Sequence, residues 1–187
     1  MARRPITRYT FRYESAEGGR VKLDPFYDLD VVLVCGLPAS GKSHFSRGYF
    51  NRDGRKRVNR KEIRRSLHQM TTFGEAWNEA LFDSGDEGLV KHVERRILEH
   101  LLHGGQKVLI DNTSVTVASR KSYVQIARQM HKSIGVIFLN TPLKTCIQRN
   151  SGRDFPVPDV AIVNLSVSQQ IPRSGEGFDE LLIIGEY

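Results

Sequence analysis

The sequence predicts an α/β domain in which a parallel sheet is covered by helices on both faces. Short apolar runs alternate with longer segments of helical periodicity from residue 31 to residue 184, as expected for parallel strands joined by crossover helices. Between the first apolar run, Val31–Cys35, and the first helical segment lies Gly36–Ser43, which has the G-x-x-x-x-G-K-[ST] spacing of a phosphate-binding loop. A length of 187 residues suits one such domain with a core of its own.

The individual elements follow, in chain order, from the period of the apolar residues. Strands are expected where short apolar runs are bounded by polar or turn residues, and helices where apolar residues recur every three or four positions. The expected strands are residues 31–35, 57–59, 107–111, 134–139 and 181–184. The expected helices are residues 42–50, 61–68, 88–103, 117–131, 142–150 and 159–170.

Two of these helices carry clear end signals. Gly104-Gly105 ends the long helix at residues 88–103, and Pro142 is expected at the first position of the helix at residues 142–150. The face of the long helix that is predicted to pack on the sheet consists of Leu89, Val93, Ile97, Leu98, Leu101 and Leu102.

Residues 1–30 are interpreted as an N-terminal extension to a domain that spans residues 31–187. Residues 7–13 alternate as a strand does, Glu17-Gly18-Gly19 is a turn signal, and residues 21–23 could return as a second strand. A short β-hairpin is therefore expected there. Residues 70–87 carry no clear pattern. Their aromatics Trp77 and Phe82 are interpreted as anchors to the core, with stacking on nucleic-acid bases as the alternative.

The composition predicts a soluble cytoplasmic protein. No apolar run approaches the ~18 residues of a membrane span, and the charged N-terminus lacks the apolar stretch of a signal peptide. Cys35 and Cys146 belong to no C-x-x-C pair, and both are expected to be buried thiols in a reducing compartment.

The net charge of +7 is concentrated in two segments. Residues 42–65 hold ten Lys and Arg against two acids, and residues 120–153 hold seven basic residues and no acid. This pattern favours a polyanionic second substrate, a nucleic acid. The alternative is a solvated basic face together with residues that handle ATP.

The loop at Gly36–Ser43 is expected to bind ATP or another nucleoside triphosphate. Its glycines let the backbone curl around phosphate oxygens, and the following helix points its first N–H groups at the same anion. Lys42 would reach the β- and γ-phosphates, and the Ser43 hydroxyl would ligate Mg²⁺. The expected nucleotide contacts are Gly36, Ala39, Ser40, Gly41, Lys42, Ser43 and His44, with Arg149 and Arg153 closing from a lid.

Asp111 ends the apolar run Val108-Leu109-Ile110, at the edge where a parallel sheet presents ligand-binding groups. A carboxylate there can hold Mg²⁺ together with Ser43. The alternative interpretation is a helix N-cap.

Arg149 and Arg153 lie four residues apart, where a helix runs into a loop with Pro156 and Pro158. Guanidinium groups suit the charge on a phosphoryl group in transfer. We interpret the segment near residues 149–158 as a lid that closes over ATP. The alternative is a pair of solvated arginines stabilised by the helix dipole.

Among phosphate-loop proteins, the GTPases are disfavoured. The segment Asp111-Asn112-Thr113-Ser114 lacks the glycine of D-x-x-G, and Asn59-Arg60-Lys61-Glu62 is not the base-reading N-K-x-D. A small phosphotransferase is the class that remains.

Several of these motifs occur in one order, and the chain resembles the 5′-hydroxyl polynucleotide kinase domain of phage and animal nucleic-acid end-repair enzymes. The resemblance covers about residues 31–184. It is carried by the phosphate loop, Val58-Asn59-Arg60 leading to Arg64, Ile110–Thr113 with Ala118–Arg120 and Tyr123–Gln125, Arg149-Asn150 with Arg153, and Pro172 through Glu176-Gly177-Phe178.

The resemblance implies a P-loop kinase fold with a five-stranded parallel sheet, using ATP and Mg²⁺ to phosphorylate 5′-OH ends of DNA or RNA. By position, Lys42 and Ser43 hold phosphate and metal, and Asp111 supports the acceptor side. Arg64 would engage the acceptor's 3′-phosphate, and Arg153 would be the lid arginine on ATP. Any ligase or phosphatase partner is expected on a separate chain.

The chain departs from the family at one position. Where the family has Asn-Arg-Asp, with that Asp as general base, this chain has Asn59-Arg60-Lys61. Glu62 is the first candidate to replace the Asp as general base. We expect a kinase that is active but slow. Two other functions stay open: a small-molecule kinase for a nucleoside or sugar, and a non-catalytic ATP-binding module.

Overall fold

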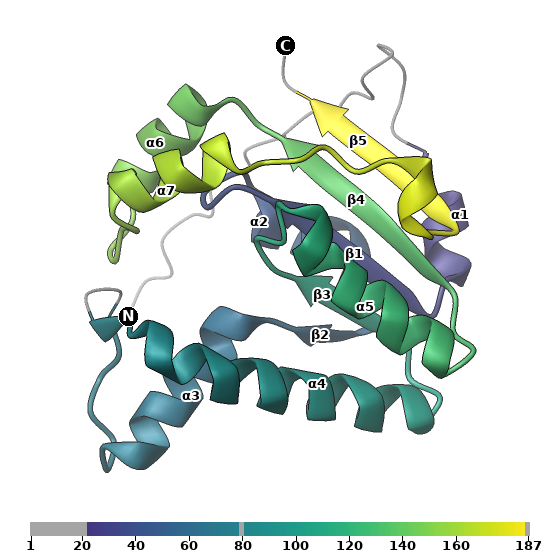
Figure 1. Ribbon diagram of the computed structural model, residues 1–187, viewed down its shortest axis with the longest axis horizontal. Coiled ribbons are helices and arrows are strands. Elements are labelled where there is room, and N and C mark those ends of the chain that lie inside the picture. The colour runs from purple at the N-terminus through teal and green to yellow at the C-terminus, as the bar shows by residue number, and fades with distance from the viewer. Residues whose placement is uncertain (1–21, 79–80, 186–187) are drawn as a thin grey trace, which may run out of the picture.

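The protein forms a single five-stranded parallel sheet with helices on both faces (Figure 1). A computed structural model describes residues 22–78 and 81–185. The strands are β1 (Val31–Gly36), β2 (Lys56–Val58), β3 (Val108–Asp111), β4 (Ile134–Asn140) and β5 (Glu180–Gly185), in the order β2-β3-β1-β4-β5. All neighbouring strands pair in parallel. The expected sheet is confirmed, and the strand that leads into the phosphate loop is its centre.

The helices divide between the two faces of the sheet. α1 (Asp24–Asp28) and α2 (Lys42–Phe50) cover one face, and α3 (Arg60–Thr71), α4 (Glu87–His103) and α5 (Val117–Gln129) cover the other. Helices α6 (Leu143–Ser151) and α7 (Asp159–Val167) lie at the carboxyl ends of the strands, and the short turns η2 (Ser84–Asp86) and η3 (Ser174–Glu176) precede α4 and β5.

The core follows from the two-residue period of the strands. Leu33, Ile110 and Val136 point to the α4–α5 side, whereas Val32 and Ile137 point to the α1–α2 side. All six residues of β1 are buried. A strand covered on both faces has to be apolar throughout, which is why this run was easy to recognise.

The segment before the sheet differs from the expected hairpin. Residues 1–21, which include the first expected strand and the turn, lie outside the described residues. Of the second expected strand, Lys22 and Leu23 are described and neither is in a strand. Instead, α1 follows, and Leu23, Phe26 and Leu29 are buried in the core beside α2.

Two local predictions were wrong. On α4, Leu89 is 50% exposed and Ile97 is 37% exposed, while the buried residues are Val90, Glu94, Leu98 and Leu102. The other four residues of the predicted face are confirmed, since Leu98 and Leu102 are buried and Val93 and Leu101 pack against the core. The prediction fails at Leu89 and Ile97, because the buried face also includes the Glu94 carboxylate. Pro142 is the N-cap of α6, one position earlier than expected. Cys35 and Cys146 are buried and free, as predicted.

Candidate active site

The phosphate loop joins β1 to α2 at the carboxyl edge of the sheet. Gly36 has φ 145°, and a Cβ on it would lie 2.5 Å from the carbonyl oxygen of Leu139 on β4. Gly41 has φ 98° and caps α2, and Ala39 adopts φ 62° between them. These left-handed positions turn the chain sharply, so that the loop curls before α2 begins. The arrangement is the one that cradles an anion at a helix N-terminus.

Lys42 lies folded back over this loop. Its Nζ donates to the carbonyl oxygens of Gly36 at 2.9 Å and Leu37 at 2.7 Å. Burial lowers the pKa of Lys42 to about 8, although the nearby Asp111 carboxylate acts in the opposite direction. The ammonium group is therefore taken out of water and held at the loop, where an anionic phosphate group would replace neutral carbonyl acceptors with a charged one.

Asp111 lies opposite Ser43, which is in the first turn of α2. Its Oδ2 accepts from Ser43 Oγ at 2.8 Å and from Nε and Nη2 of Arg57 at 2.9 and 2.7 Å. The side chain is 1% exposed, and its Oδ1 has no hydrogen-bond partner among the described residues. A buried carboxylate oxygen without a donor, beside a serine hydroxyl, suits a hard cation such as Mg²⁺. Ser43 and Asp111 therefore fit the predicted metal site.

Arg57 connects this carboxylate to the start of α3. Its Nη1 lies 2.6 Å from Glu62 Oε1, while its other donors bind Asp111. Asn59 caps α3 by accepting from the Glu62 N–H at 3.1 Å, and its side-chain amide donates to the Asp111 carbonyl. Sequence reasoning placed Arg57 in a general basic surface. Its actual position depends on the pairing of β2 with β3, the strand that carries Asp111.

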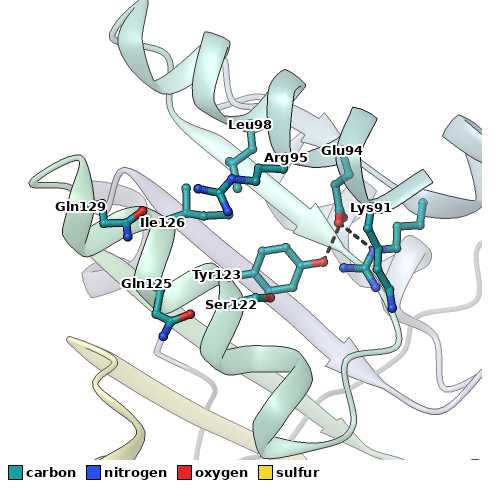
Figure 2. Close-up of a pocket in the computed structure, with 10 residues that line it drawn as sticks. Lys91, Glu94, Arg95, Leu98, Ser122, Tyr123, Gln125, Ile126 and Gln129 are labelled. Carbon is teal, nitrogen blue, oxygen red and sulfur yellow. Dashed lines mark hydrogen bonds and ion pairs between the residues drawn. The ribbon is translucent and has the colours of Figure 1, made fainter. Parts of the chain in front are cut away.

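A buried polar network holds α3, α4 and α5 together behind Asp111 (Figure 2). Arg60 Nε lies 2.6 Å from Glu94 Oε2, and the other oxygen of Glu94 accepts from Asn112 and, at 2.9 Å, from the Tyr123 hydroxyl. Burial raises the pKa of Tyr123, so the phenol keeps the proton that it donates. The Arg60 N–H donates to Asn112 Oδ1 at 2.9 Å. The network therefore fixes the backbone on both sides of the site. Glu94 belongs to no sequence motif, and only the packing of the three helices reveals its position.

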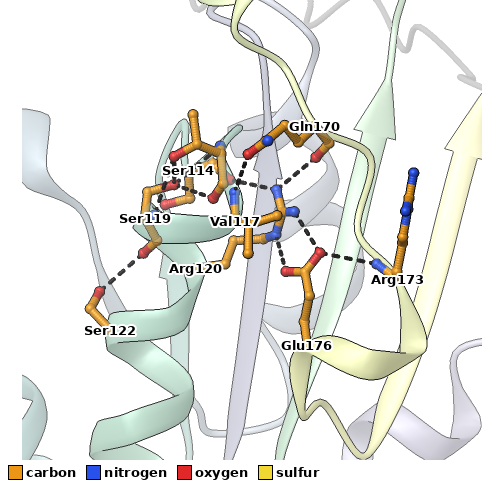
Figure 3. A network of polar contacts seen from close by, with 9 residues as sticks. Ser114, Val117, Ser119, Arg120, Ser122, Gln170, Arg173 and Glu176 are labelled. Atoms are coloured by element: carbon orange, nitrogen blue, oxygen red, sulfur yellow. Dashed lines mark hydrogen bonds and ion pairs between the residues drawn. The ribbon is translucent and has the colours of Figure 1, made fainter.

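A second network ties the end of β3 to the segment before β5 (Figure 3). Arg120 is fully buried and forms a bidentate salt bridge with Glu176, in which both nitrogen–oxygen distances are 2.7 Å. Its Nη1 also donates to the carbonyl oxygens of Ser114 and Gln170. The motif residues Arg120 and Glu176, 56 positions apart, are thus partners in the fold.

The remaining predicted residues lie around the loop. His44 is in the first turn of α2, and Ser40 is buried within the loop. Arg149 lies in the last turn of α6, and Arg153 follows that helix, near enough to Lys42 to act against its positive charge. Arg64 pairs with Glu87, and its guanidinium carbon lies 5.1 Å from the ring centre of Phe82.

The structure corrects part of the charge interpretation. Arg55 is buried, binds Asp53 at 2.9 Å, and donates to backbone carbonyls of Leu29, Phe26 and Val108. Arg120 is buried as described above. Neither contributes to a basic surface, because each satisfies carbonyl oxygens that would otherwise be orphaned in the interior.

The interpretation of both aromatics as anchors to the core is wrong for Phe82. Phe82 is 49% exposed and so is not a core anchor. Trp77 packs its ring against His68, with ring centres 5.5 Å apart.

The fold and the loop define a P-loop kinase, and comparison with known proteins agrees. Residues 31–173 match the family model AAA_33, described as an AAA domain, and the chain belongs to this family. The fold is accordingly a P-loop kinase fold, the class of nucleotide-binding phosphotransferases. Among the described residues, no helix has both the length and the apolar character needed to span a membrane.

Two curated proteins show related sequences. L-seryl-tRNA(Sec) kinase of Methanococcus maripaludis is 22% identical over 151 residues, which are 80% of this chain and 56% of that protein. A protein of Acanthamoeba polyphaga mimivirus, assigned as a bifunctional polynucleotide phosphatase/kinase, is 23% identical over 166 residues, 84% of this chain and 34% of that protein. The chain therefore spans about half of the first relative's length and about a third of the second's.

Solved structures show the same fold in proteins of different function. A chain of the Pnkp1/Rnl/Hen1 RNA repair complex aligns with a TM-score of 0.60 at 19% identity, covering 88% of this chain and 46% of that one. A gluconokinase from Sinorhizobium meliloti aligns with a TM-score of 0.58 at 12% identity, covering 83% and 81%. Likeness at such identities shows the fold alone.

Proposed function

We propose that the protein is an ATP-dependent polynucleotide kinase that transfers the γ-phosphate of ATP to a 5′-OH end of DNA or RNA. The observation that carries the proposal is the continuous polar chain from Ser43 through Asp111 and Arg57 to Glu62. It joins the phosphate loop directly to the segment around Asn59 that resembles the acceptor site of polynucleotide kinases.

On the donor side, the loop at residues 36–43 would hold the phosphates of ATP. Lys42 would leave its two carbonyl partners and neutralise charge on the transferring phosphoryl group. Ser43 and Asp111 would hold Mg²⁺, which supplies further neutralisation of phosphate charge when bound. Arg149 and Arg153 would close from the end of α6 and exclude water.

On the acceptor side, the 5′ hydroxyl oxygen would attack the γ-phosphorus as the bond to the β–γ bridging oxygen breaks, so that ADP leaves. Glu62 is 62% exposed at its side chain and would accept the hydroxyl proton. Arg57 orients both Glu62 and Asp111, and Arg64 would contact the acceptor's 3′-phosphate. Because the transition state of phosphoryl transfer is loose, positioning and charge matter more than early proton removal.

The relatives support an acceptor attached to nucleic acid. One is named as a kinase of L-seryl-tRNA(Sec), and the other as a polynucleotide phosphatase/kinase. A cytoplasmic protein that works with a separate ligase or phosphatase chain fits this proposal. The lysine at position 61 is the feature that keeps a non-catalytic ATP-binding module as the second candidate.

The test is transfer of radiolabelled γ-phosphate from ATP to a panel of acceptors. The panel contains a DNA and an RNA oligonucleotide of one sequence with 5′-OH ends, the same two with 5′-phosphates, a nucleoside and a sugar. We expect label only on the 5′-OH oligonucleotides. Lys42→Ala should abolish labelling, whereas Arg47→Ala, which removes an exposed cation from the same helix, should not.

Other outcomes would assign a different function. Labelling of the nucleoside or sugar in preference to oligonucleotides would make the protein a small-molecule kinase. ATP binding without transfer to any acceptor would make it an ATP-binding module.

A further inference from the structure

A groove between α4 and α5 lies directly behind the network that supports Asp111. Its volume is about 200 Å³. The floor is buried and consists of Leu98, Tyr123 and Ile126, and the side chains at its rim come from the two facing helices (Figure 2). We call this surface the α4–α5 groove.

The rim of the groove is cationic and amide-bearing. Lys91 and Arg95 stand on α4, and Gln125 and Gln129 stand on α5. Lys91 and Arg95 are one helical turn apart, about 6 Å along the axis. Arg95 also pairs at 2.7 Å with Glu99, an exposed contact that an incoming anion can exchange for its own.

Glu94 lines this groove, but its carboxylate would not repel an anion bound there. Its two oxygens are occupied by Arg60, Asn112 and Tyr123, and its side chain is 3% exposed. The ring of Tyr123 is buried with the Arg60 guanidinium carbon 5.7 Å from its centre, so its face is not open to a stacking base. The groups left for a ligand are two cations, two amides and the Ser122 hydroxyl, which are typical of contacts to a sugar–phosphate backbone.

We propose that the α4–α5 groove binds the phosphodiester backbone of the acceptor strand beyond its 5′-terminal nucleotide. The inference rests on the proposed function and names where the rest of its substrate lies. Asn112 connects the two sites, because it follows Asp111 in the chain and donates to Glu94 under the groove. Helices α4 and α5 then run away from the carboxyl edge of the sheet, so the groove leads away from the phosphate loop (Figure 1).

The proposal predicts that short and long acceptors differ. A nucleoside 3′-monophosphate fills only the site near Asp111, whereas a 15-nucleotide strand also reaches the groove. Contacts through phosphates carry no sequence information and weaken with salt. The groove should therefore lower the Kd of long strands regardless of their sequence.

The experiment measures binding and transfer separately. Anisotropy of a 15-nucleotide single strand with a 3′-fluorescein reports binding, and labelling from γ-labelled ATP reports kcat/KM for that strand without the dye and for a nucleoside 3′-monophosphate. The groove variant is Lys91→Ala with Arg95→Ala. The matched control is Arg96→Ala with Lys121→Ala, which removes the same charge from exposed positions of the same two helices outside the groove.

We expect the groove variant to raise the Kd of the strand about tenfold at 150 mM salt, and to reduce the slope of log Kd against log salt by about two. Its kcat/KM should fall for the strand and stay unchanged for the mononucleotide. The control should stay within twofold of the parent. Equal effects of the two variants, or no binding of the strand to the parent protein, would overturn the groove. Binding that depends on the groove without any transfer would keep the groove and overturn the proposed kinase activity.

Discussion

Lys42 shows at the scale of one residue how the loop prepares for its ligand. The ammonium is buried against two carbonyl groups, and this burial lowers its pKa to about 8. The neutral form therefore gains population just above physiological pH in the absence of nucleotide. A bound polyphosphate favours the charged form, so nucleotide binding and protonation of Lys42 are coupled.

This coupling gives a pH dependence of nucleotide affinity. Lys42 is protonated below pH 8 and neutral above it, so the Kd of a non-hydrolysable ATP analogue should be nearly constant from pH 7 to 8. It should then rise by up to about tenfold per pH unit above 8, with proton uptake on binding. Calorimetry in two buffers of different ionisation enthalpy measures both effects. Lys42→Arg, whose guanidinium does not titrate in this range, should remove the dependence; if it persists there, another group is responsible.

Position 61 tests the acceptor site. Lys61 offers no carboxylate to accept the hydroxyl proton, and the Glu62 carboxylate lies 2.6 Å from Arg57. Lys61→Asp should raise kcat with 5′-OH strands by up to ~10²–10⁴-fold, the usual value of general-base assistance, with the KM for ATP unchanged. Lys61→Asn removes the cation without adding a base and serves as the control. Glu62→Gln should lower kcat in the parent. Loss of transfer in Lys61→Asp would mean that Lys61 holds substrate phosphate.

At the scale of elements, strands and helices could be predicted within a few residues because their apolar periods are regular. The phosphate loop could be predicted completely, since its residues are consecutive and its chemistry depends on their spacing. Arg57, Glu94 and Arg120 could not, because each acquires its role from a partner distant in sequence. Glu94 in particular lies on a helix whose apolar pattern points elsewhere, and only the packing of three helices makes its burial favourable.

The salt bridge between Arg120 and Glu176 is expected to be the strongest polar interaction between secondary-structure elements. The Arg120 side chain is fully buried, the Glu176 side chain is 10% exposed, and Arg120 also satisfies two carbonyl groups. Glu176→Ala leaves that guanidinium without its carboxylate and should lower the free energy of unfolding by about 3–5 kcal/mol. Urea unfolding measures the loss. Arg96→Ala breaks an exposed pair with Glu99 and should cost less than about 1 kcal/mol; similar losses for both would show that the buried pair is not special.

At the scale of the whole molecule, fewer positive charges are available to bind a polyanion than the sequence suggests. Arg55 and Arg120 are in the interior, and Arg57 and Arg60 are paired with carboxylates of the site. The two basic chain segments therefore offer fewer cations to a polyanion than their sequence counts suggest. Charge reversal at Arg55 should impair folding rather than raise the KM for an acceptor strand.

The affinity for a polynucleotide should nevertheless depend on salt. A strand that displaces counterions at several phosphates should bind at least tenfold more weakly at 200 mM than at 50 mM salt, while ATP affinity changes little. The KM values for a 5′-OH strand and for ATP, measured across this range, check the expectation. A KM for the acceptor that is insensitive to salt would favour a small-molecule acceptor.

The central strand and one edge strand of the sheet differ in local stability. β1 is wholly buried and hydrogen-bonded to a strand on each side, whereas β2 is three residues long and pairs with β3 alone. Amide protons of β1 should exchange with solvent only on global unfolding, and those of β2 through small local openings. Arg57 belongs to β2, so local openings are expected on the proposed acceptor side of the site while β1 stays closed. In the proposed polynucleotide kinase, this difference would let the acceptor side adapt to different strand ends while the loop keeps its hold on ATP.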